Sequence, residues 1–355
     1  QARPPETQIL VMQSKIIEAI KLTDGNIAVS YSGGKESGFL LYHVAQIWKE
    51  TYGRSRNLVA IFANTGCEFK TMWPFIQHFV EWLQERFDIC IDLRTVSAKQ
   101  PFSKTIKTIG YPFPSKKQAR MISDVRKQMR DLGVTYEDIC HYIRGGIRGA
   151  DAMREMGFSD TVVCDVTGIK SDNEPGTCVI SRRWAPLIYA PFEVTKECCP
   201  IHKTGPIHEL EKTLGNLQPM IGEMAENSQT RMNSYRQTGC NMFKDGVGVS
   251  KPMGPMTGQT VAWYYHTAGI PLAPPYGEPL LVDGYYKYSG EQNTGCKLCG
   301  FGIMYDWDRF DRLKAIEPET VRWAFKPIAD GGLSYGEVCR FINTDCRGKI
   351  VIPKT

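Results

Sequence analysis

The sequence lacks any long apolar run, and this excludes a membrane-spanning helix. No stretch among its 355 residues approaches the roughly 20 consecutive apolar residues that a span requires. The first five residues are too polar for a signal peptide, so we expect a cytoplasmic protein that does not contact a membrane. Internal repeats and low-complexity tracts are also missing. With 42% hydrophobic residues, the chain is predicted to fold around one or two cores.

A strong net charge is missing too. The 43 basic and 38 acidic residues give a net charge of +5, which suits a protein that handles phosphates but falls short of a nucleic-acid-binding signature. Nucleic acid therefore stays open as a partner. A helix predicted over residues 116–132 carries six basic side chains that could serve nucleic acid, although a solvated face is the usual role of such a run. They are Lys116, Lys117, Arg120, Arg126, Lys127 and Arg130.

Strands and helices alternate in the N-terminal third. Short apolar runs predict buried strands at residues 26–31, 58–63 and 89–93, and apolar residues at helical spacing predict helices at 37–49 and 73–87. This alternation predicts an α/β fold with a parallel, Rossmann-like sheet and helices on both faces. We expect a domain over residues 1–240 and a smaller, mainly helical region over 241–355. Further expected elements are strands at 161–169 and 218–222, a connector at 245–255, and helices at 260–266, 308–314 and 318–325.

The first predicted strand runs directly into a glycine pair that opens a helix. Glycines allow backbone N–H groups to approach an anion, and the helix dipole favours negative charge at this point. The alternative, an ordinary glycine turn between a strand and a helix, fits the six-residue context less well. The spacing of glycines and lysine is not that of a Walker A loop. The predicted phosphate ligands are Ser32, Gly33, Gly34, Lys35, Glu36 and Ser37.

This loop resembles the Ser-Gly-Gly-Lys-Asp-Ser loop of the PP-loop ATP pyrophosphatases, a group that includes the phosphoadenylyl-sulfate (PAPS) reductase family. Residues 62–68, Phe-Ala-Asn-Thr-Gly-Cys-Glu, are similar to that family's Asn-Thr-Gly-x-Glu segment. The resemblance implies a fold of the adenine nucleotide alpha-hydrolase type, bound ATP or a sulfonucleotide, and Mg²⁺. Glu36 replaces the usual Asp, so its carboxylate would reach a magnesium ion with a different geometry. The residues implied near the nucleotide are Asn64, Thr65, Gly66 and Glu68.

Twelve cysteines are many for a cytosolic chain, where thiols stay reduced, and four of them form two tight pairs. By spacing alone, the pairs Cys198-Cys199 and Cys296-x-x-Cys299 fit a metal centre, a redox dithiol or buried core positions. Both segments resemble the cysteine segments of adenylyl-sulfate reductases. That resemblance implies a 4Fe–4S cluster held by Cys198, Cys199, Cys296 and Cys299. Cys240 is an alternative ligand, and a buried core position fits it equally well.

A third segment of partial similarity lies between the two cysteine pairs. Residues 222–231 resemble the Gly-x-Arg-x-x-Glu-Ser-x-x-Arg substrate motif of the same family. Ser228 and Arg231 stay in register, whereas Met224 replaces the inner Arg and Asn227 replaces the Glu. The match implies that Ser228 contacts the nucleotide. Arg231 is a candidate for bidentate binding of phosphate or sulfate, with a solvated helix position as the alternative.

Two departures favour ATP over a sulfonucleotide as the substrate. Sulfonucleotide reductases carry a nucleophilic Cys in a Glu-Cys-Gly-x-His tail, and neither Cys339 nor Cys346 has that context. The phosphate loop of those reductases is eroded, whereas this chain keeps both glycines and Lys35. We therefore expect an ATP pyrophosphatase that adenylates an acceptor for sulfur transfer, with Lys35 and Arg231 as catalytic residues.

Two other functions stay open at this point. One is an adenylyl-sulfate or PAPS reductase-like enzyme in which Cys346 replaces the usual nucleophile. The other is a nucleotide-binding component of a defence or mobile-element complex, since the resemblance is best to reductase-like proteins of phages and mobile elements. The acceptor, the sulfur donor and assembly into a homo-oligomer stay open as well.

Overall fold

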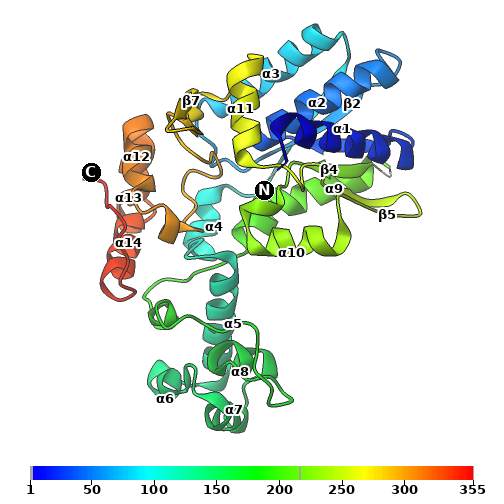
Figure 1. The fold of residues 1–355 in the computed structure, drawn as a ribbon. Coiled ribbons are helices and arrows are strands. Elements are labelled where there is room, and N and C mark those ends of the chain that lie inside the picture. Colours follow the sequence, from blue (N-terminus) through cyan, green and yellow to red (C-terminus); the bar gives the residue numbers. More distant parts are fainter. Residues whose placement is uncertain (1–2, 216, 355) are drawn as a thin grey trace. The chain divides into compact units, whose positions relative to one another are not determined.

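The computed structural model describes residues 3–215 and 217–354, and the chain divides into two compact units (Figure 1). The first unit consists of Gln1–Lys99 and His202–Lys297, and the second of Gln100–Ile201 and Leu298–Thr355. Each unit therefore joins two separate stretches of sequence. The domain division expected between residues 240 and 241 does not coincide with a boundary of either unit.

The first unit is built on a six-stranded, mostly parallel sheet. Its strand order is β3-β2-β1-β4-β6-β5, and β5 pairs antiparallel with β6. A separate hairpin joins β7 and β8. The strands are β1 (Ile27–Ser30), β2 (Leu58–Asn64), β3 (Ile91–Ser97), β4 (Gln218–Ile221), β5 (Asn241–Lys244), β6 (Val247–Ser250), β7 (Pro279–Val282) and β8 (Tyr285–Tyr288).

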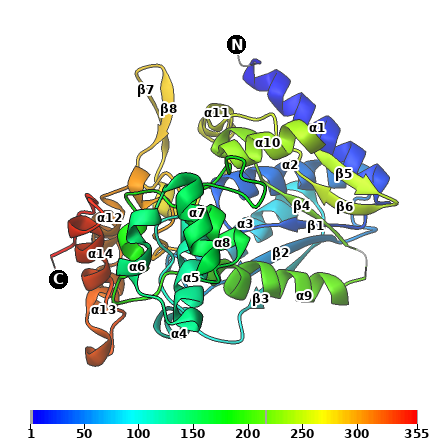
Figure 2. The same ribbon diagram turned by 90° about the horizontal axis from the view of Figure 1, so that it is seen from below.

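Helices cover both faces of this sheet. Figure 2 shows α1 and α2 on one face and α9 on the other. Strand β1 is buried between β2 and β4, which explains why it reads as a short, continuous apolar run. The helices of this unit are α1 (Pro5–Leu22), α2 (Lys35–Thr51), α3 (Met72–Phe87), α9 (Gly205–Thr213), α10 (Gln229–Thr238) and α11 (Gly258–Ala268). The α/β fold with a mostly parallel sheet is thus confirmed.

Helix α2 follows the phosphate loop and is anchored deep in the core. Phe39, Leu40, Val44 and Trp48 are fully or almost fully buried along it, at the helical spacing that the sequence indicated. This burial fixes the direction of α2 and therefore the position of its N-terminus. The orientation of the loop in front of α2 is set by the core and not by the loop alone.

The second unit is mainly helical. Its basic helix α5 has the predicted bounds and begins after Ser115, whose hydroxyl accepts a hydrogen bond from the backbone N–H of Gln118 at 3.2 Å. The helices are α4 (Phe102–Thr108), α5 (Lys116–Leu132), α6 (Tyr136–Ile139), α7 (Gly146–Glu155), α8 (Asp160–Thr167), α12 (Arg309–Ile316), α13 (Pro318–Phe325) and α14 (Tyr335–Thr344). Among the described residues, no helix combines the length and apolar character needed to cross a bilayer.

Two predicted elements are wrong. Residues 161–167 lie in helix α8 (Asp160–Thr167) and do not form a strand: Val162, Val163 and Val166 are buried along this helix, and Gly168 ends it at φ +82°. Here packing outweighs the β-branched composition. The expected connector at 245–255 contains strand β6, which pairs with β5 across an Asp-Gly turn whose two residues both have positive φ. Asp-Gly is a hairpin signal that the prediction overlooked.

The buried imidazole of His43 on α2 predicts an acid-sensitive fold. It is fully buried, its Nε2 has no hydrogen-bond partner, and burial lowers its pKa from 6.5 to about 3. Between pH 6.5 and about pH 3, His43 is mostly protonated in the unfolded chain and mostly neutral in the folded chain. The contribution of His43 to the free energy of unfolding therefore falls as the pH falls through this window, by about 1.4 kcal/mol per pH unit.

Replacing His43 with Phe is expected to remove this part of the pH dependence. The apolar ring suits its neighbours, since the His43 ring centroid lies 4.6 Å from that of Phe39 and 5.1 Å from that of Tyr264. Urea unfolding at pH 7 and at pH 5 measures the effect. The free energy of unfolding of the variant, minus that of wild type, should be larger at pH 5 than at pH 7. If this difference is the same at both pH values, the pH dependence does not come from His43.

Candidate functional site

The predicted phosphate loop connects the carboxyl end of β1 to the N-terminus of α2. Gly33 has φ +74°, and a Cβ atom on it would lie 2.6 Å from Cε of Met72 and 2.9 Å from Cγ1 of Ile76 on α3. Only glycine fits this turn without strain. Gly34 then caps α2 with an extended backbone and no side-chain hydrogen bond to the helix. The first N–H groups of α2 thus follow a tight glycine turn, which is the geometry of an anion site.

The loop lies where the strand order of the sheet reverses. Along the chain, β1 is followed by its neighbour β2 on one side, whereas β4 flanks it on the other. Ligands of open α/β sheets bind at the carboxyl ends of the strands at such a point. Gly222 directly follows β4, and a Cβ atom on it would lie 3.1 Å from the carbonyl oxygen of Glu36. The end of β4 therefore packs closely against the first turn of α2.

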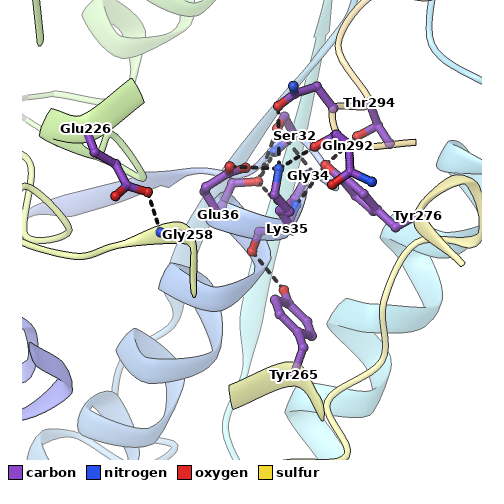
Figure 3. A network of polar contacts seen from close by, with 12 residues as sticks. Ser32, Gly34, Lys35, Glu36, Glu226, Gly258, Tyr265, Tyr276, Gln292 and Thr294 are labelled. Carbon is purple, nitrogen blue, oxygen red and sulfur yellow. Dashed lines mark hydrogen bonds and ion pairs between the residues drawn. The ribbon is translucent and has the colours of Figure 1, made fainter. Parts of the chain in front are cut away.

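Lys35 is the best-connected residue of the loop (Figure 3). Its side chain is 9% exposed, and its Nζ lies 3.0 Å from Oε1 of Glu36 and donates a hydrogen bond to the carbonyl oxygen of Gln292 at 2.6 Å. The ammonium group also lies 5.2 Å and 5.5 Å from the ring centroids of Tyr276 and Tyr288. Two anionic or polar oxygens and two aromatic faces thus surround this cation.

Tyrosine hydroxyls contact both backbone polar groups of Lys35, the first residue of α2. The backbone N–H of Lys35 donates to Oη of Tyr276 at 3.1 Å, and Oη of Tyr265 donates to the carbonyl oxygen of Lys35 at 2.9 Å. Burial raises the pKa of Tyr276 to about 12, so its hydroxyl is neutral. Ser32 and Ser37 face each other across the loop with their hydroxyl oxygens 3.1 Å apart.

The segment after β2 forms a compact, self-bonded loop. The carboxylate of Glu68 accepts hydrogen bonds from the backbone N–H and from the hydroxyl of Thr65, at 3.1 and 2.6 Å. Oδ1 of Asn64 accepts one from the N–H of Gly66 at 3.0 Å. Because β2 lies parallel to β1, this loop is at the same edge of the sheet as the phosphate loop. The polar side chains that the resemblance placed at the nucleotide thus hold their own loop together.

The partial substrate motif contributes to the fold as well. Ser228 caps α10, with its hydroxyl accepting from the N–H of Arg231 at 3.2 Å, and Nε of Arg231 lies 3.5 Å from Oε2 of Glu223. Met224, which stands where the related motif has Arg, is buried in the core of the first unit. Glu226 accepts a hydrogen bond from the N–H of Gly258 at the start of α11 (Figure 3). Arg231 is 44% exposed in its side chain, and so is accessible to a ligand.

Cys296 lies beside the loop that follows β2, in the first unit. Hydrogen bonds with the Cys67 thiol and with the Thr65 hydroxyl, whose Oγ1 is 3.5 Å from the Cys296 sulfur, lower the pKa of Cys296 to about 7 against the effect of burial. A thiolate is therefore available near neutral pH, and this is the form that binds iron. Cys67 is buried, and its thiol pairs with Cys296.

The remaining predicted cluster ligands belong to the second unit: Cys198, Cys199 and Cys299. Within the residues described here, no group of three or more His, Cys, Asp or Glu side chains has an arrangement that could hold a metal ion. Thiolates are the usual ligands of iron–sulfur clusters, so the four cysteines suit a cluster by their chemistry alone, and the ligand set stays a prediction. Cys240 is buried in the first unit and burial raises its pKa, which suits a core position.

The alternative nucleophile departs from expectation. Cys346, the alternative nucleophile of a reductase, is fully buried, and burial raises its pKa to about 12. It is therefore a poor nucleophile in this state.

Several basic side chains of helix α5 form ion pairs or hydrogen bonds with other residues of the second unit. Arg120 pairs with Asp165 at 2.9 Å, and Nη1 of Arg126 donates to three backbone carbonyls, among them that of Phe192 at 2.8 Å. Arg130 pairs with Glu193 at 2.9 Å. These contacts leave less of the helix for nucleic acid than the sequence suggested.

Sequence reasoning missed the residues that surround Lys35. Tyr265, Tyr276, Tyr288 and Gln292 are far from the loop in sequence, and none belongs to a motif. No protein-family model matches this chain, and no curated protein is similar to it. The assignment of the site therefore depends on its geometry.

Proposed function

We propose that the first unit binds an adenine nucleotide, with the phosphates at the loop of residues 32–37, and that the substrate is ATP. The observation that supports this most is the glycine turn between β1 and α2, at the carboxyl end of a central parallel strand where the strand order reverses. The buried Lys35 in the first turn of α2 supplies a cation at the same place.

The proposed reaction is transfer of the adenylyl group to an acceptor. An acceptor oxygen attacks the α-phosphorus, the bond from the α-phosphorus to the oxygen bridging the α- and β-phosphates breaks, and pyrophosphate leaves with that oxygen. The N–H groups of the loop and the ammonium group of Lys35 would stabilise the charge that develops on the leaving phosphates. Arg231 would bind a further phosphate oxygen after exchanging its contact with Glu223. A sulfur nucleophile supplied as a co-substrate would then attack the activated carbon of the adenylated acceptor, so that a C–S bond forms, the C–O bond to the adenylyl group breaks and AMP leaves.

An iron–sulfur cluster is part of the proposal. The thiolates of Cys198, Cys199, Cys296 and Cys299 would hold it, and a cluster with four protein ligands supplies electrostatic or structural support because no iron is left to carry sulfide. Mg²⁺ would neutralise the phosphates. The reductase alternative has less support, since the thiol that it needs, Cys346, is buried.

Anaerobically purified protein provides the test. We expect about four iron atoms per chain with a visible absorption band, and binding of ATP. Pyrophosphate should be released together with the adenylated acceptor, or together with AMP when water takes the adenylyl group. Adenylyl sulfate is the comparison ligand, and sulfite release from it would favour the reductase. Iron-loaded protein that neither binds ATP nor releases pyrophosphate with any acceptor would end the proposal.

A further inference from the structure

Residues 276–294, here called the strap, accept hydrogen bonds from groups of the phosphate loop that would otherwise donate to a bound anion. The backbone N–H of Lys35 is one of the N–H groups in the first turn of α2 that have no partner within the helix. It donates to Oη of Tyr276 at 3.1 Å. A Cβ atom on Gly34 would lie 3.4 Å from the same oxygen. The phenol oxygen thus stands where an anionic oxygen would accept this hydrogen bond.

The strap also holds the side-chain cation of the loop. Nζ of Lys35 donates to the carbonyl oxygen of Gln292 at 2.6 Å and lies 3.5 Å from Oδ1 of Asn293. Tyr276 and Tyr288 present their ring faces to the same ammonium group. The strap therefore binds two hydrogen-bond donors of Lys35, the backbone N–H and the side-chain Nζ (Figure 3).

The strap is fixed from within. Oη of Tyr276 accepts a second hydrogen bond from the hydroxyl of Thr294 at 2.8 Å, and the N–H of Gly290 donates to the carbonyl oxygen of Tyr276 at 2.8 Å. The fit is tight, since a Cβ atom on Gly290 would lie 2.3 Å from the carbonyl oxygen of Pro275. The exception is Tyr288, which is 7% exposed and whose hydroxyl has no hydrogen-bond partner. A buried hydroxyl without a partner beside Lys35 indicates that a ligand oxygen belongs there.

We propose that the strap is an internal latch, which occupies the phosphate loop in the ligand-free protein and is displaced from Lys35 when a phosphate or pyrophosphate group binds. This inference rests on the proposed function and names how the same site is regulated. Tyr276 is the residue that competes with the ligand, and Tyr288 gains a partner when the ligand arrives. Because the strap must leave the phosphate loop before the ligand can bind, the apparent affinity of the loop for phosphate groups is lower than its intrinsic affinity.

Removing the competing hydroxyl tests the latch. The variant Tyr276→Phe keeps the ring and loses the oxygen that binds the N–H of Lys35, so it should bind ATP and inorganic pyrophosphate about fivefold more tightly than wild type. Tyr265→Phe is the matched control, because it also removes a tyrosine hydroxyl bound to Lys35, but one that donates to the carbonyl oxygen and does not occupy the N–H. It should bind neither ligand more tightly. Titration calorimetry measures both.

Thr294→Val gives an independent route if the first variant does not fold. It removes only the hydroxyl that anchors Tyr276, and it should tighten binding in the same direction but less. Hydrogen exchange in wild type adds a direct readout. The backbone N–H groups of Gly290 and Glu291 donate to the carbonyl oxygens of Tyr276 and of the adjacent Pro275, and they should exchange faster when pyrophosphate is bound.

The outcomes separate the two proposals. Suppose that wild type binds ATP, that Tyr276→Phe and Thr294→Val bind it no more tightly, and that hydrogen exchange in the strap is unchanged. This result overturns the latch but not the nucleotide site. Binding of pyrophosphate but not ATP, with the expected gain in Tyr276→Phe, supports the latch and overturns the choice of nucleotide. No binding of either ligand to wild type or to either variant overturns both.

Discussion

Replacing Lys35 with Ala is expected to weaken ATP binding by about 10- to 100-fold, since a hydrogen bond to a charged group contributes about 1.5–3 kcal/mol and each 1.4 kcal/mol is tenfold. The ammonium group is largely buried beside the glycine turn, where water screens it poorly. The lower end of the range applies if the strap competes, because the variant also loses the contacts of Lys35 with Gln292, Tyr276 and Tyr288 in the ligand-free state.

Lys49→Ala is the matched control for this loss. Lys49 lies near the other end of the same helix and pairs with the exposed Asp88 at 3.2 Å, so the variant removes an equal charge away from the loop. Its ATP affinity should match that of wild type. Thermal unfolding of both variants shows whether they remain folded. A folded Lys35→Ala protein that binds ATP as tightly as wild type would remove the central cation from the proposed site.

A double variant tells the two roles of Lys35 apart. Only the side chain is lost in Lys35→Ala, so the backbone N–H at position 35 can still donate to Tyr276. Tyr276→Phe should therefore raise ATP affinity in the Lys35→Ala background too, although from a weaker starting point. If the gain disappears there, the strap acts on the ammonium group alone.

The core of the first unit could be predicted because local and tertiary signals agree there. Strand β1 and helix α2 have apolar runs at the expected periods, and the two glycines between them permit one kind of connection. At α8 the two signals disagree. Its valines favour a strand, but burial of Val162, Val163 and Val166 along one helix, ended by Gly168, decides for a helix. Such a decision depends on neighbours that the local sequence does not reveal.

The candidate site was predictable only in part, for a related reason. Residues 32–37 are contiguous, and their chemistry can be recognised from the sequence. The groups that contact them are not contiguous, since Tyr276 and Gln292 reach Lys35 only after the chain has passed through the second unit and returned. A single tyrosine in a loop carries no signal of its contact with a distant N–H group.

Met224 and Glu226 illustrate how a partial motif changes its use. Where the similar motif has an arginine, Met224 packs in the core, and Glu226 accepts a hydrogen bond from the N–H of Gly258 at the start of helix α11. A buried arginine at position 224 would need a partner for its charge, whereas methionine fills the space without one. Of this motif, Arg231 keeps the exposure that a ligand contact requires.

The second large effect is expected for Gly33→Ala, which should lower the free energy of unfolding by about 2–5 kcal/mol. A left-handed backbone costs a non-glycine residue about 1–2 kcal/mol, and overpacking costs about 1–3 kcal/mol more. Both apply at φ +74°, where the new methyl would lie 2.6 Å from Cε of Met72 and 2.9 Å from Cγ1 of Ile76. Urea unfolding gives the total, and a loss below about 1 kcal/mol would contradict the packing described here.

Gly66→Ala separates the two contributions. Gly66 has φ +71°, and a Cβ atom on it would meet nothing within 4 Å, so this variant carries the backbone cost without the clash. The difference between the two variants is then the cost of moving α3 or its side chains. Truncation at Met72→Ala should recover part of that difference in Gly33→Ala, because the methyl then meets only Ile76. If no part is recovered, the strain lies in the backbone of the loop, and the glycine serves the approach of an anion and not the packing of α3.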